Sequence, residues 1–193
     1  MVRTKEFDPD AALQAALELF WRRGYEATSM ADLVEHLGVS RASIYATFGN
    51  KHDLYLRAFD RYLESRQPSP VERLSQPGPV LPAVRALVES YVAEAAHDEQ
   101  RRGCMVINTA VELVPGDAVA ARRVESNWDE FETALASALT RARAQGELAA
   151  GADPRALARM LLVLLQGLKV VGKGAPDRSR LRDAAEQALR LLE

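Results

Sequence analysis

Apolar side chains recur every three or four positions along most of the chain, the spacing of one face of an α-helix. Between residues 9 and 23 this spacing predicts a first helix. Asp8 is placed to cap it, Pro9 suits its first turn, and Gly24 follows its end. The apolar positions of this helix are Leu13, Ala16, Leu17 and Phe20.

Two short helices separated by a tight turn are predicted next. Ser29 and Asp32 have the spacing of a capping box and open a helix that Gly38 ends. Gly38-Val39-Ser40 then forms the turn, and Ser40 caps a very short helix over residues 41–47. Ile44 and Phe48 lie one turn apart and are expected to pack inward, which leaves the rest of this helix exposed.

A fourth helix begins after Asn50, which forms a capping pair with Asp53, and runs to about residue 66. Residues 67–79 contain four prolines and are predicted to be an irregular connection. Five further helices are expected over 81–97, 103–114, 117–145, 154–171 and 177–192. The sequence shows neither the alternating pattern of β-strands nor an internal repeat that would favour another fold class. We predict an all-α fold of about nine helices, with an N-terminal three-helix domain over residues 1–50 and a larger C-terminal domain over residues 51–193.

The composition indicates a globular protein: 48% of its 193 residues are hydrophobic, 27% are charged, and the formal net charge is -2. The N-terminus lacks the apolar run of a signal peptide, and the most apolar segment, 157–171, is too short to span a membrane. We therefore expect a cytoplasmic protein with no membrane partner. The single cysteine, Cys104, excludes an intrachain disulfide and a thiolate metal cluster.

An enzyme is a poor interpretation of this sequence. His36, His52 and His97 are scattered without metal-ligand spacing, and neither a phosphate-binding loop nor a nucleophile elbow is present. No catalytic residue, metal ligand or cofactor is predicted. Nor is the chain basic overall: residues 1–57 contain seven Lys and Arg against eight Asp and Glu. A nucleic-acid interaction must therefore depend on where the charges lie.

The charges are favourably placed around the tight turn. Between Glu35 and Asp53 the only full charges are those of Arg41 and Lys51. In addition, residues 28–54, which read TSMADLVEHLGVSRASIYATFGNKHDL, resemble the DNA-binding signature of the TetR family of transcriptional regulators. The resemblance includes the Gly-Val-Ser turn, the Ile-Tyr pair and the Phe-Gly-Asn-Lys close. It covers roughly residues 7–60, and the remainder matches mainly in length and helical plan.

The resemblance implies that the short helix at residues 41–47 enters the major groove of double-stranded operator DNA. Arg41, Ala42, Ser43 and Thr47 would face the bases, with Arg41 suited to a guanine edge. Thr28, Tyr45 and Lys51 would contact phosphates. Two alternatives stay open: Tyr45 packs partly between helices, and the helix pair as a whole is only a packing unit.

The predicted helix over residues 154–171 is apolar around much of its circumference, and the last helix carries Leu and Ala residues at helical spacing. The family pairs two such helices from each chain into a homodimer. The interface residues expected on this basis are Leu161, Leu164, Leu165, Leu168, Leu181, Ala185 and Leu189. The alternative is that these side chains form a core within one chain. Within the same segment Lys169 is unusual, and we expect its ammonium group to reach outward to water.

The C-terminal domain is expected to bind a small molecule, as in the family. Candidate wall residues combine apolar bulk with a few polar groups: Tyr91, Cys104, Asn108, Trp128, Phe131 and Met160. The segment RRGCMVIN, residues 101–108, resembles a Gly-Cys subgroup of the family that includes electrophile-sensing repressors. Near a helix start and two arginines, Cys104 could be a reactive thiolate; alternatively it is a small buried residue.

The sequence therefore predicts a TetR-type regulator, a repressor that a small molecule or thiol-reactive signal releases from its operator. The alternative is a ligand-binding or scaffold protein of the same fold without a role in transcription.

Overall fold

The computed structural model describes residues 7–174 and 177–192, and every regular element in these two ranges is a helix. The all-α prediction is thus confirmed, with ten helices within the described ranges where about nine were expected. They are α1 (Pro9–Arg23), α2 (Met30–Leu37), α3 (Arg41–Phe48), α4 (Lys51–Glu64), α5 (Pro70–Leu74), α6 (Val80–Ala96), α7 (Met105–Glu112), α8 (Ala118–Ala144), α9 (Pro154–Lys173) and α10 (Arg178–Arg190).

The additional helix is α5, which lies in the segment predicted to be irregular. Ser69 caps it by accepting a 3.1 Å hydrogen bond from the Glu72 amide, and the Glu72 carboxylate accepts one of 2.7 Å from the Ser69 amide. Pro70 occupies the first turn, where its missing N–H is not needed. Our prediction therefore overlooked a capping box among the prolines, and it was wrong for these five residues.

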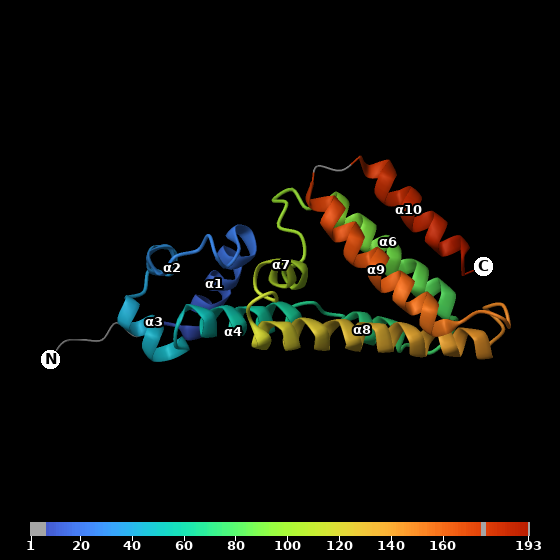
Figure 1. The fold of residues 1–193 in the computed structure, drawn as a ribbon, viewed down its shortest axis with the longest axis horizontal. Coiled ribbons are helices and arrows are strands. Elements are labelled where there is room, and N and C mark those ends of the chain that lie inside the picture. Colours follow the sequence, from blue (N-terminus) through green and yellow to red (C-terminus); the bar gives the residue numbers. More distant parts are fainter. Residues whose placement is uncertain (1–6, 175–176, 193) are drawn as a thin grey trace.

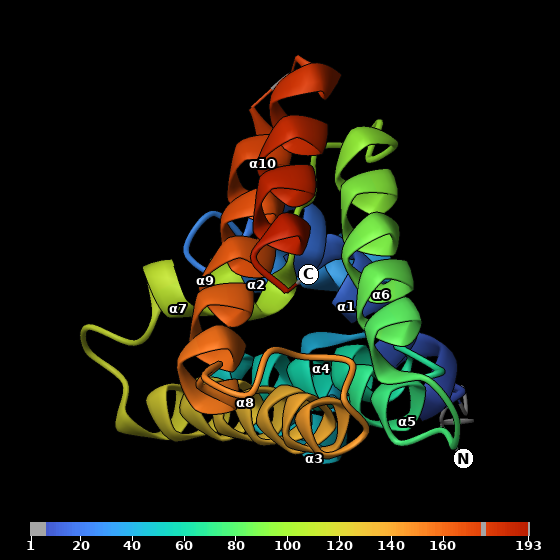
Figure 2. The same cartoon turned by 90° about the vertical axis from the view of Figure 1, so that its right-hand side faces the viewer.

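The helices form an elongated molecule (Figure 1). Helices α1 to α4 lie at one end, and α8 runs along the long axis toward the other. There α6 and α9 run side by side above α8, and α10 packs on both of them (Figure 2). The contact between α6 and α9 is very close, because a Cβ atom at Gly172 would lie only 2.7 Å from the Cβ of Ala95.

Buried side chains form two apolar clusters. The first joins α1, α3 and α4 to α7 and the first turns of α8, with Phe20, Ile44, Phe59, Met105 and Val124 among its members. The second joins α6, the rest of α8, α9 and α10. Because α7 and α8 contribute to the first cluster, the N-terminal helices are packed against the C-terminal part and are not merely tethered to it.

Helix α4 is the element that the two parts share. Leu54 and Phe59 are fully buried in the first cluster, against α1. At the other end of α4, Tyr62 and the following Arg66 reach a cavity bordered by α6 and α9. The boundary after residue 50 stays a prediction, and the packing shows that α4 belongs to both sides of it.

Candidate functional site

The sequence between α1 and α4 folds into two short helices joined by a turn. Ser29 and Asp32 form the predicted capping box of α2. Gly38 then adopts the left-handed conformation at φ 63°, which a side chain would disfavour. The Ser40 hydroxyl caps α3 by accepting a 3.1 Å hydrogen bond from the Ser43 amide. Local capping thus fixes where α2 ends and α3 begins.

Helix α3 buries one face and leaves the other in solvent. Ile44 and Phe48 are inside, 0% and 3% exposed. Arg41, Ala42 and Tyr45 are exposed, and Ser43 and Thr47 are half-buried. Tyr45 is 46% exposed, which argues against its packing between helices. The exposed face agrees with the predicted reading surface, while the contacts of these side chains with DNA stay a prediction.

Thr28 does not lie where we expected. Its side chain is 0% exposed, and its hydroxyl donates a 2.7 Å hydrogen bond to the Gly24 carbonyl oxygen. The hydroxyl therefore closes the turn between α1 and α2. A direct phosphate contact from this side chain, as predicted, is wrong for the conformation seen here, because the group is enclosed and already bonded.

Lys51 also differs from the prediction of a phosphate contact. Its Nζ atom donates hydrogen bonds of 2.8 Å to the carbonyl oxygens of Tyr25 and Thr28. It also lies 4.0 Å from the centroid of the Tyr25 ring, a cation-π distance. The charge at the start of α4 thus fastens the turn that precedes α2, and the ammonium group is occupied within the protein.

Besides the paired hydrogen bonds from Arg123 of α8 to Asp60 of α4, three hydrogen bonds connect the N-terminal helices to α7 and α8. They join the Tyr25 amide to Glu112 Oε2 (2.6 Å), Tyr55 Oη to Thr109 Oγ1 (2.8 Å), and His52 Nε2 to Asp117 Oδ2. The carboxylates come from the end of α7 and the N-cap of α8. The start of α4 and the turn before α2 are therefore bonded directly to α7 and to the start of α8.

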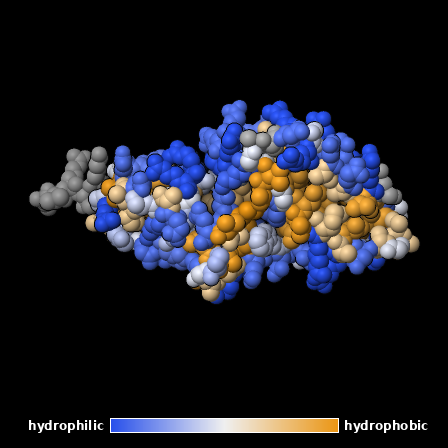
Figure 3. All heavy atoms as spheres, turned by 45° about the horizontal axis from the view of Figure 1, so that its top comes forward, coloured by the Kyte–Doolittle hydropathy of each residue, from blue (hydrophilic) through white to orange (hydrophobic). Residues whose placement is uncertain are grey.

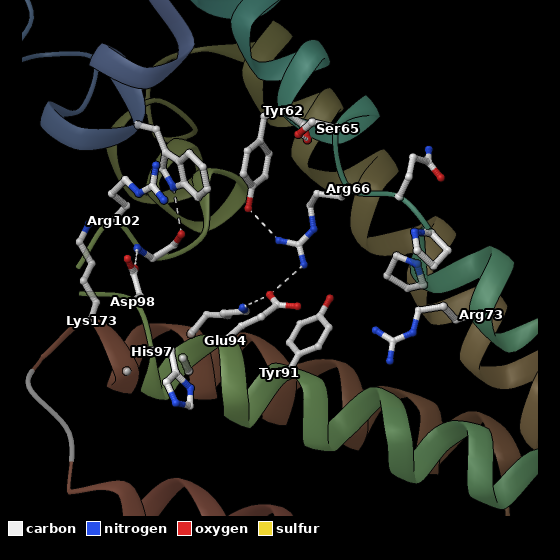
Figure 4. Close-up of a pocket in the computed structure, with 18 residues that line it drawn as sticks. Tyr62, Ser65, Arg66, Arg73, Tyr91, Glu94, His97, Asp98, Arg102 and Lys173 are labelled. Carbon is white, nitrogen blue, oxygen red and sulfur yellow. Dashed lines mark hydrogen bonds and ion pairs between the residues drawn. The ribbon is translucent and has the colours of Figure 1, made fainter. Parts of the chain in front are cut away.

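A cavity of about 740 Å³ lies where the two parts of the chain meet, between α1, the end of α4, α6, the α6–α7 segment and α9 (Figure 4). We call it the junction cavity. Arg66 reaches into it between Tyr62 and Glu94. Trp21 of α1 closes one side by donating a 2.9 Å hydrogen bond to the Gly103 carbonyl oxygen. The size is typical of pockets that hold small molecules.

A second cavity of about 330 Å³, the inner cavity, lies on the other side of Arg66 and Tyr91. Its wall includes Phe131, Gln166 and Cys104. Cys104 is the N-cap residue of α7 and is 8% exposed. Its Sγ atom accepts a 3.6 Å hydrogen bond from the Tyr62 hydroxyl, so the thiol is linked to a residue of the junction cavity.

Half of the predicted wall residues line these two cavities. They are Tyr91, Cys104 and Phe131. The other three, Asn108, Trp128 and Met160, are wall residues of neither cavity. Trp128 packs against the first apolar cluster and Met160 against the second. Asn108 is bonded to its surroundings, since its side chain donates to the Arg102 carbonyl oxygen and accepts from Lys173.

Lys169 corrects another expectation. Its side chain is only 8% exposed and points inward, where its Nζ donates to the Glu94 carboxylate and lies 4.9 Å from the Tyr91 ring centroid. We expected this ammonium group to reach water. The carboxylate on α6 supplies the partner that lets the charge stay inside.

Most of the residues predicted for the dimer interface lie in the core of the single chain. Six of them are at most 5% exposed, namely Leu161, Leu165, Leu168, Leu181, Ala185 and Leu189. Only Leu164 is half-buried. The prediction was wrong for the six because α6 and α8 cover that side of α9, and because α10 turns its apolar side to α6 and α9. Apolar residues also occupy the outer side of α9, where Val163, Val170 and Val171 are 71%, 54% and 40% exposed.

Apolar side chains gather in a band across this face of the molecule (Figure 3). The outer valines of α9 are spaced seven and eight residues apart, so they lie on one side of the helix. Gly167 lies between them and leaves room for close approach. We call Val163, Gly167, Val170 and Val171 the outer α9 face.

Several cavity residues were not anticipated from the sequence. Trp21 of α1, Tyr62 and Arg66 at the end of α4, and Arg102 of the α6–α7 segment line the junction cavity. Only Tyr62 and Arg66 are close in the sequence, and Trp21 and Arg102 join them through long-range packing. The one available signal was an arginine placed just after a helix rich in aromatic residues.

Residues 7–174 and 177–192 contain no group of three or more His, Cys, Asp or Glu side chains that could hold a metal ion. In the same ranges no helix combines the length and the apolar character needed to cross a membrane.

Comparison with known proteins matches both parts of the chain. Residues 12–58 match the model of bacterial regulatory proteins of the tetR family, and residues 80–190 match the tetracyclin repressor-like C-terminal domain. The HTH-type transcriptional regulator YezE of Bacillus subtilis is 39% identical over 100% of both chains. The HTH-type transcriptional repressor ComR of Escherichia coli is 33% identical over 98% of this chain and 90% of its own length.

A solved structure agrees in fold as well. A cysteine mutant of the TetR family regulator CifR, complexed with 26-bp double-strand operator DNA, is 32% identical. It superposes with a TM-score of 0.86 over 99% of this chain and 100% of that chain. With the capped α2–turn–α3 unit and both family models matched, this chain belongs to the TetR family of DNA-binding transcriptional regulators.

Proposed function

We propose that this chain is a homodimeric repressor whose operator binding ends when a small molecule occupies the junction cavity. The observation that carries the proposal is the exposed face of α3, with Arg41, Ala42 and Tyr45 in solvent above a buried Ile44 and Phe48. Relatives support it: ComR is named a repressor, and CifR is bound to operator DNA.

The free arginine strengthens this interpretation. Across the described ranges, no hydrogen bond or ion pair engages Arg41, so its guanidinium is available to a base edge. Residues 36–52, which include all of α3 and the turns on either side of it, contain no carboxylate, so α3 itself brings no negative charge to the phosphates.

The position of the junction cavity suggests how a ligand acts. Trp21 belongs to α1, and Tyr62 belongs to α4, and both helices pack in the first cluster with α3. A molecule held between them and α6 changes the separation of the two parts. It lowers operator affinity if it binds the DNA-incompetent arrangement more tightly than the competent one.

The operator experiment begins with the purified chain and a random pool of double-stranded DNA. Selection for binding yields the operator, and fluorescence anisotropy then measures its affinity. We expect a two-fold symmetric sequence, because a dimer presents two copies of α3. Selection that enriches no sequence would overturn the regulatory role and favour the alternative of a ligand-binding or scaffold protein. A genome-wide binding profile would make the same distinction in cells.

The outer α9 face is the dimer surface in this proposal. Exposed apolar patches of this kind mark association sites. Sedimentation should show a dimer, and the double variant Val163→Asp, Val170→Asp should be a monomer with weakened operator binding. Ala149→Asp, in the exposed turn after α8, serves as control. A double variant that stays dimeric would move the interface elsewhere.

A thiol-reactive signal is the second candidate stimulus. Cys104 lines the inner cavity, and its thiol is bonded to Tyr62 of the junction cavity. Adding a group to Sγ would displace Tyr62 and Arg66 together. Mass spectrometry after mild exposure to N-ethylmaleimide tests access to the thiol, and Cys104→Ser provides the unreactive control. An unmodified Cys104 in the folded chain rejects the thiol signal.

The role proposed is regulatory and not catalytic. The homologues named above are transcriptional regulators, and the cations and aromatic rings in the wall of the junction cavity are suited to binding a ligand.

A further inference from the structure

Positive charge predominates around the junction cavity. Its wall contains five Lys and Arg side chains against two Asp and Glu side chains. The chain as a whole carries a formal net charge of -2, so this excess is local. Cations gathered around one cavity lower the energy of an anion bound there.

Only part of this charge is neutralised within the protein. The Glu94 carboxylate pairs with Lys169 and, at 3.5 Å, with Nη2 of Arg66. The other acid, Asp98, accepts a 2.6 Å hydrogen bond from the Gly103 amide. Among the described residues, no carboxylate lies within ion-pair distance of the remaining three cations, which are Arg73, Arg102 and Lys173.

Arg66 is the cation best placed to hold a ligand. Figure 4 shows its guanidinium at the centre of the cavity wall, between Tyr62 and Glu94. Nη1 donates to the Tyr62 hydroxyl at 2.8 Å, whereas the contact of Nη2 with Glu94 is long. The planar fork of an arginine therefore has a donor edge that an incoming carboxylate or sulfonate would bind more closely than Glu94 does.

The remaining wall supplies an apolar surface beside this charge. The Tyr62 and Tyr91 rings have their centroids 5.7 Å from the Arg66 Cζ atom. Across the cavity, Arg102 lies 4.0 Å above the Trp21 ring, and its Nε is buried with no hydrogen-bond partner among the described residues. Burial raises the pKa of Tyr91 to about 12, so its hydroxyl stays protonated and can donate at neutral pH.

We propose that the junction cavity binds a small organic anion, with its acidic group on Arg66 and a flat apolar body against the tyrosine rings. This inference rests on the proposed function, because it names the class of molecule that the effector cavity accepts. Glu94 acts as the internal counter-ion that the ligand replaces beside Arg66.

The test uses a matched pair of fluorescent probes with the full chain and no DNA. Anilinonaphthalene sulfonate carries an anionic group, and N-phenylnaphthylamine has the same ring system without it. We expect the anionic probe to bind at one site per chain and benzoate, but not benzamide, to displace it. Equal binding of both probes would overturn the proposal.

Two substitutions of opposite sign make the test independent of general damage to the fold. Arg66→Met should weaken binding of the anionic probe by roughly ten-fold or more, as expected for a lost charge-assisted hydrogen bond. Glu94→Gln should strengthen it by several-fold, because a competing carboxylate is removed. Arg122→Met, on the exposed side of α8, removes a cation outside the cavity and should change nothing.

The outcomes separate this inference from the proposed function. Weaker anion binding in Glu94→Gln, or unchanged binding in Arg66→Met with melting curves like the parent's, would reject the anion class. Operator selection that still succeeds would then leave the regulatory role intact. If operator selection fails while the anionic probe binds as expected, the cavity does bind organic anions and the regulatory role is rejected.

Discussion

The Glu112 carboxylate, at the end of α7, accepts a 2.6 Å hydrogen bond from the backbone amide of Tyr25, in the turn between α1 and α2. The turn leaves no room for a side chain beside it, since a Cβ atom on Gly24 would lie 2.1 Å from Glu112 Oε1. Helix α7 starts next to Gly103, which borders the junction cavity. One short helix therefore spans the distance from the cavity to the turn that carries α2.

Replacing Glu112 by alanine should loosen this connection. The Tyr25 amide would lose its charged acceptor. Such a loss lowers the free energy of unfolding by about 1 to 3 kcal/mol at a site protected from water, and by less at an exposed one. Hydrogen exchange should become faster at Tyr25, while exchange in α6 and α9 stays as in the parent. Glu125→Ala, on the exposed side of α8, is the control. Unchanged exchange at Tyr25 would show that the carboxylate does not hold the turn.

A second prediction concerns the ammonium group that fastens the same turn. Lys51→Met removes two hydrogen bonds of 2.8 Å and the cation-π contact with Tyr25. We expect the free energy of unfolding to fall by about 1 to 3 kcal/mol and operator affinity to fall with it. Chemical denaturation and anisotropy measure the two effects. If operator affinity falls while the free energy of unfolding is unchanged, Lys51 contacts a phosphate, as the family resemblance implied.

Local signals in the sequence were sufficient for the helices and for the exposed face of α3. Helix α2 begins at the capping box of Ser29 and Asp32 and ends at Gly38. Both signals act over a few residues, so they can be recognised in the sequence without knowledge of the fold. The burial of Ile44 and Phe48 follows from their spacing. These features depend on neighbouring residues and not on contacts with distant parts of the chain.

Long-range packing decided the features that the sequence did not reveal. Lys51 bonds to carbonyl groups more than twenty residues away, and Lys169 pairs with Glu94 on another helix. Helix α9 is apolar around most of its circumference, which indicates that two of its sides are covered by other helices. The sequence does not show which of the two sides packs within the same chain. Leu161 and Val163 are equally apolar, yet one is fully buried and the other 71% exposed.

A third prediction follows from the exposure of Arg41. Arg41→Ala should reduce operator affinity by about 1 to 3 kcal/mol and relax the preference at one base pair. Stability should not change, because the side chain is exposed at the start of α3. Titrations on operators altered at single positions and at two salt concentrations test this. Equal losses on every sequence would mean that Arg41 contacts phosphate and does not read a base.

The last prediction uses the acid that caps α2. Hydrogen bonds from the Ser29 hydroxyl and amide, with a smaller effect of Arg23, lower the pKa of Asp32 from 3.8 to about 2. A carboxyl group whose pKa is lower in the folded chain stabilises that state fully above its unfolded pKa. The stabilisation is lost as the pH falls from 3.8 toward 2, because the proton then binds the unfolded chain first.

Asp32→Asn should therefore be less stable than the parent at pH 5 and above, and the difference should shrink as the pH falls through the same window. Urea denaturation of both proteins at several pH values measures it, and taking the difference cancels the acid sensitivity of the other carboxylates. The Asn side chain can still accept from the Ser29 amide, so what is lost is the charge. A difference that stays constant from pH 5 to pH 2 would show that the charge of Asp32 contributes nothing to the cap and that geometry alone sets the start of α2.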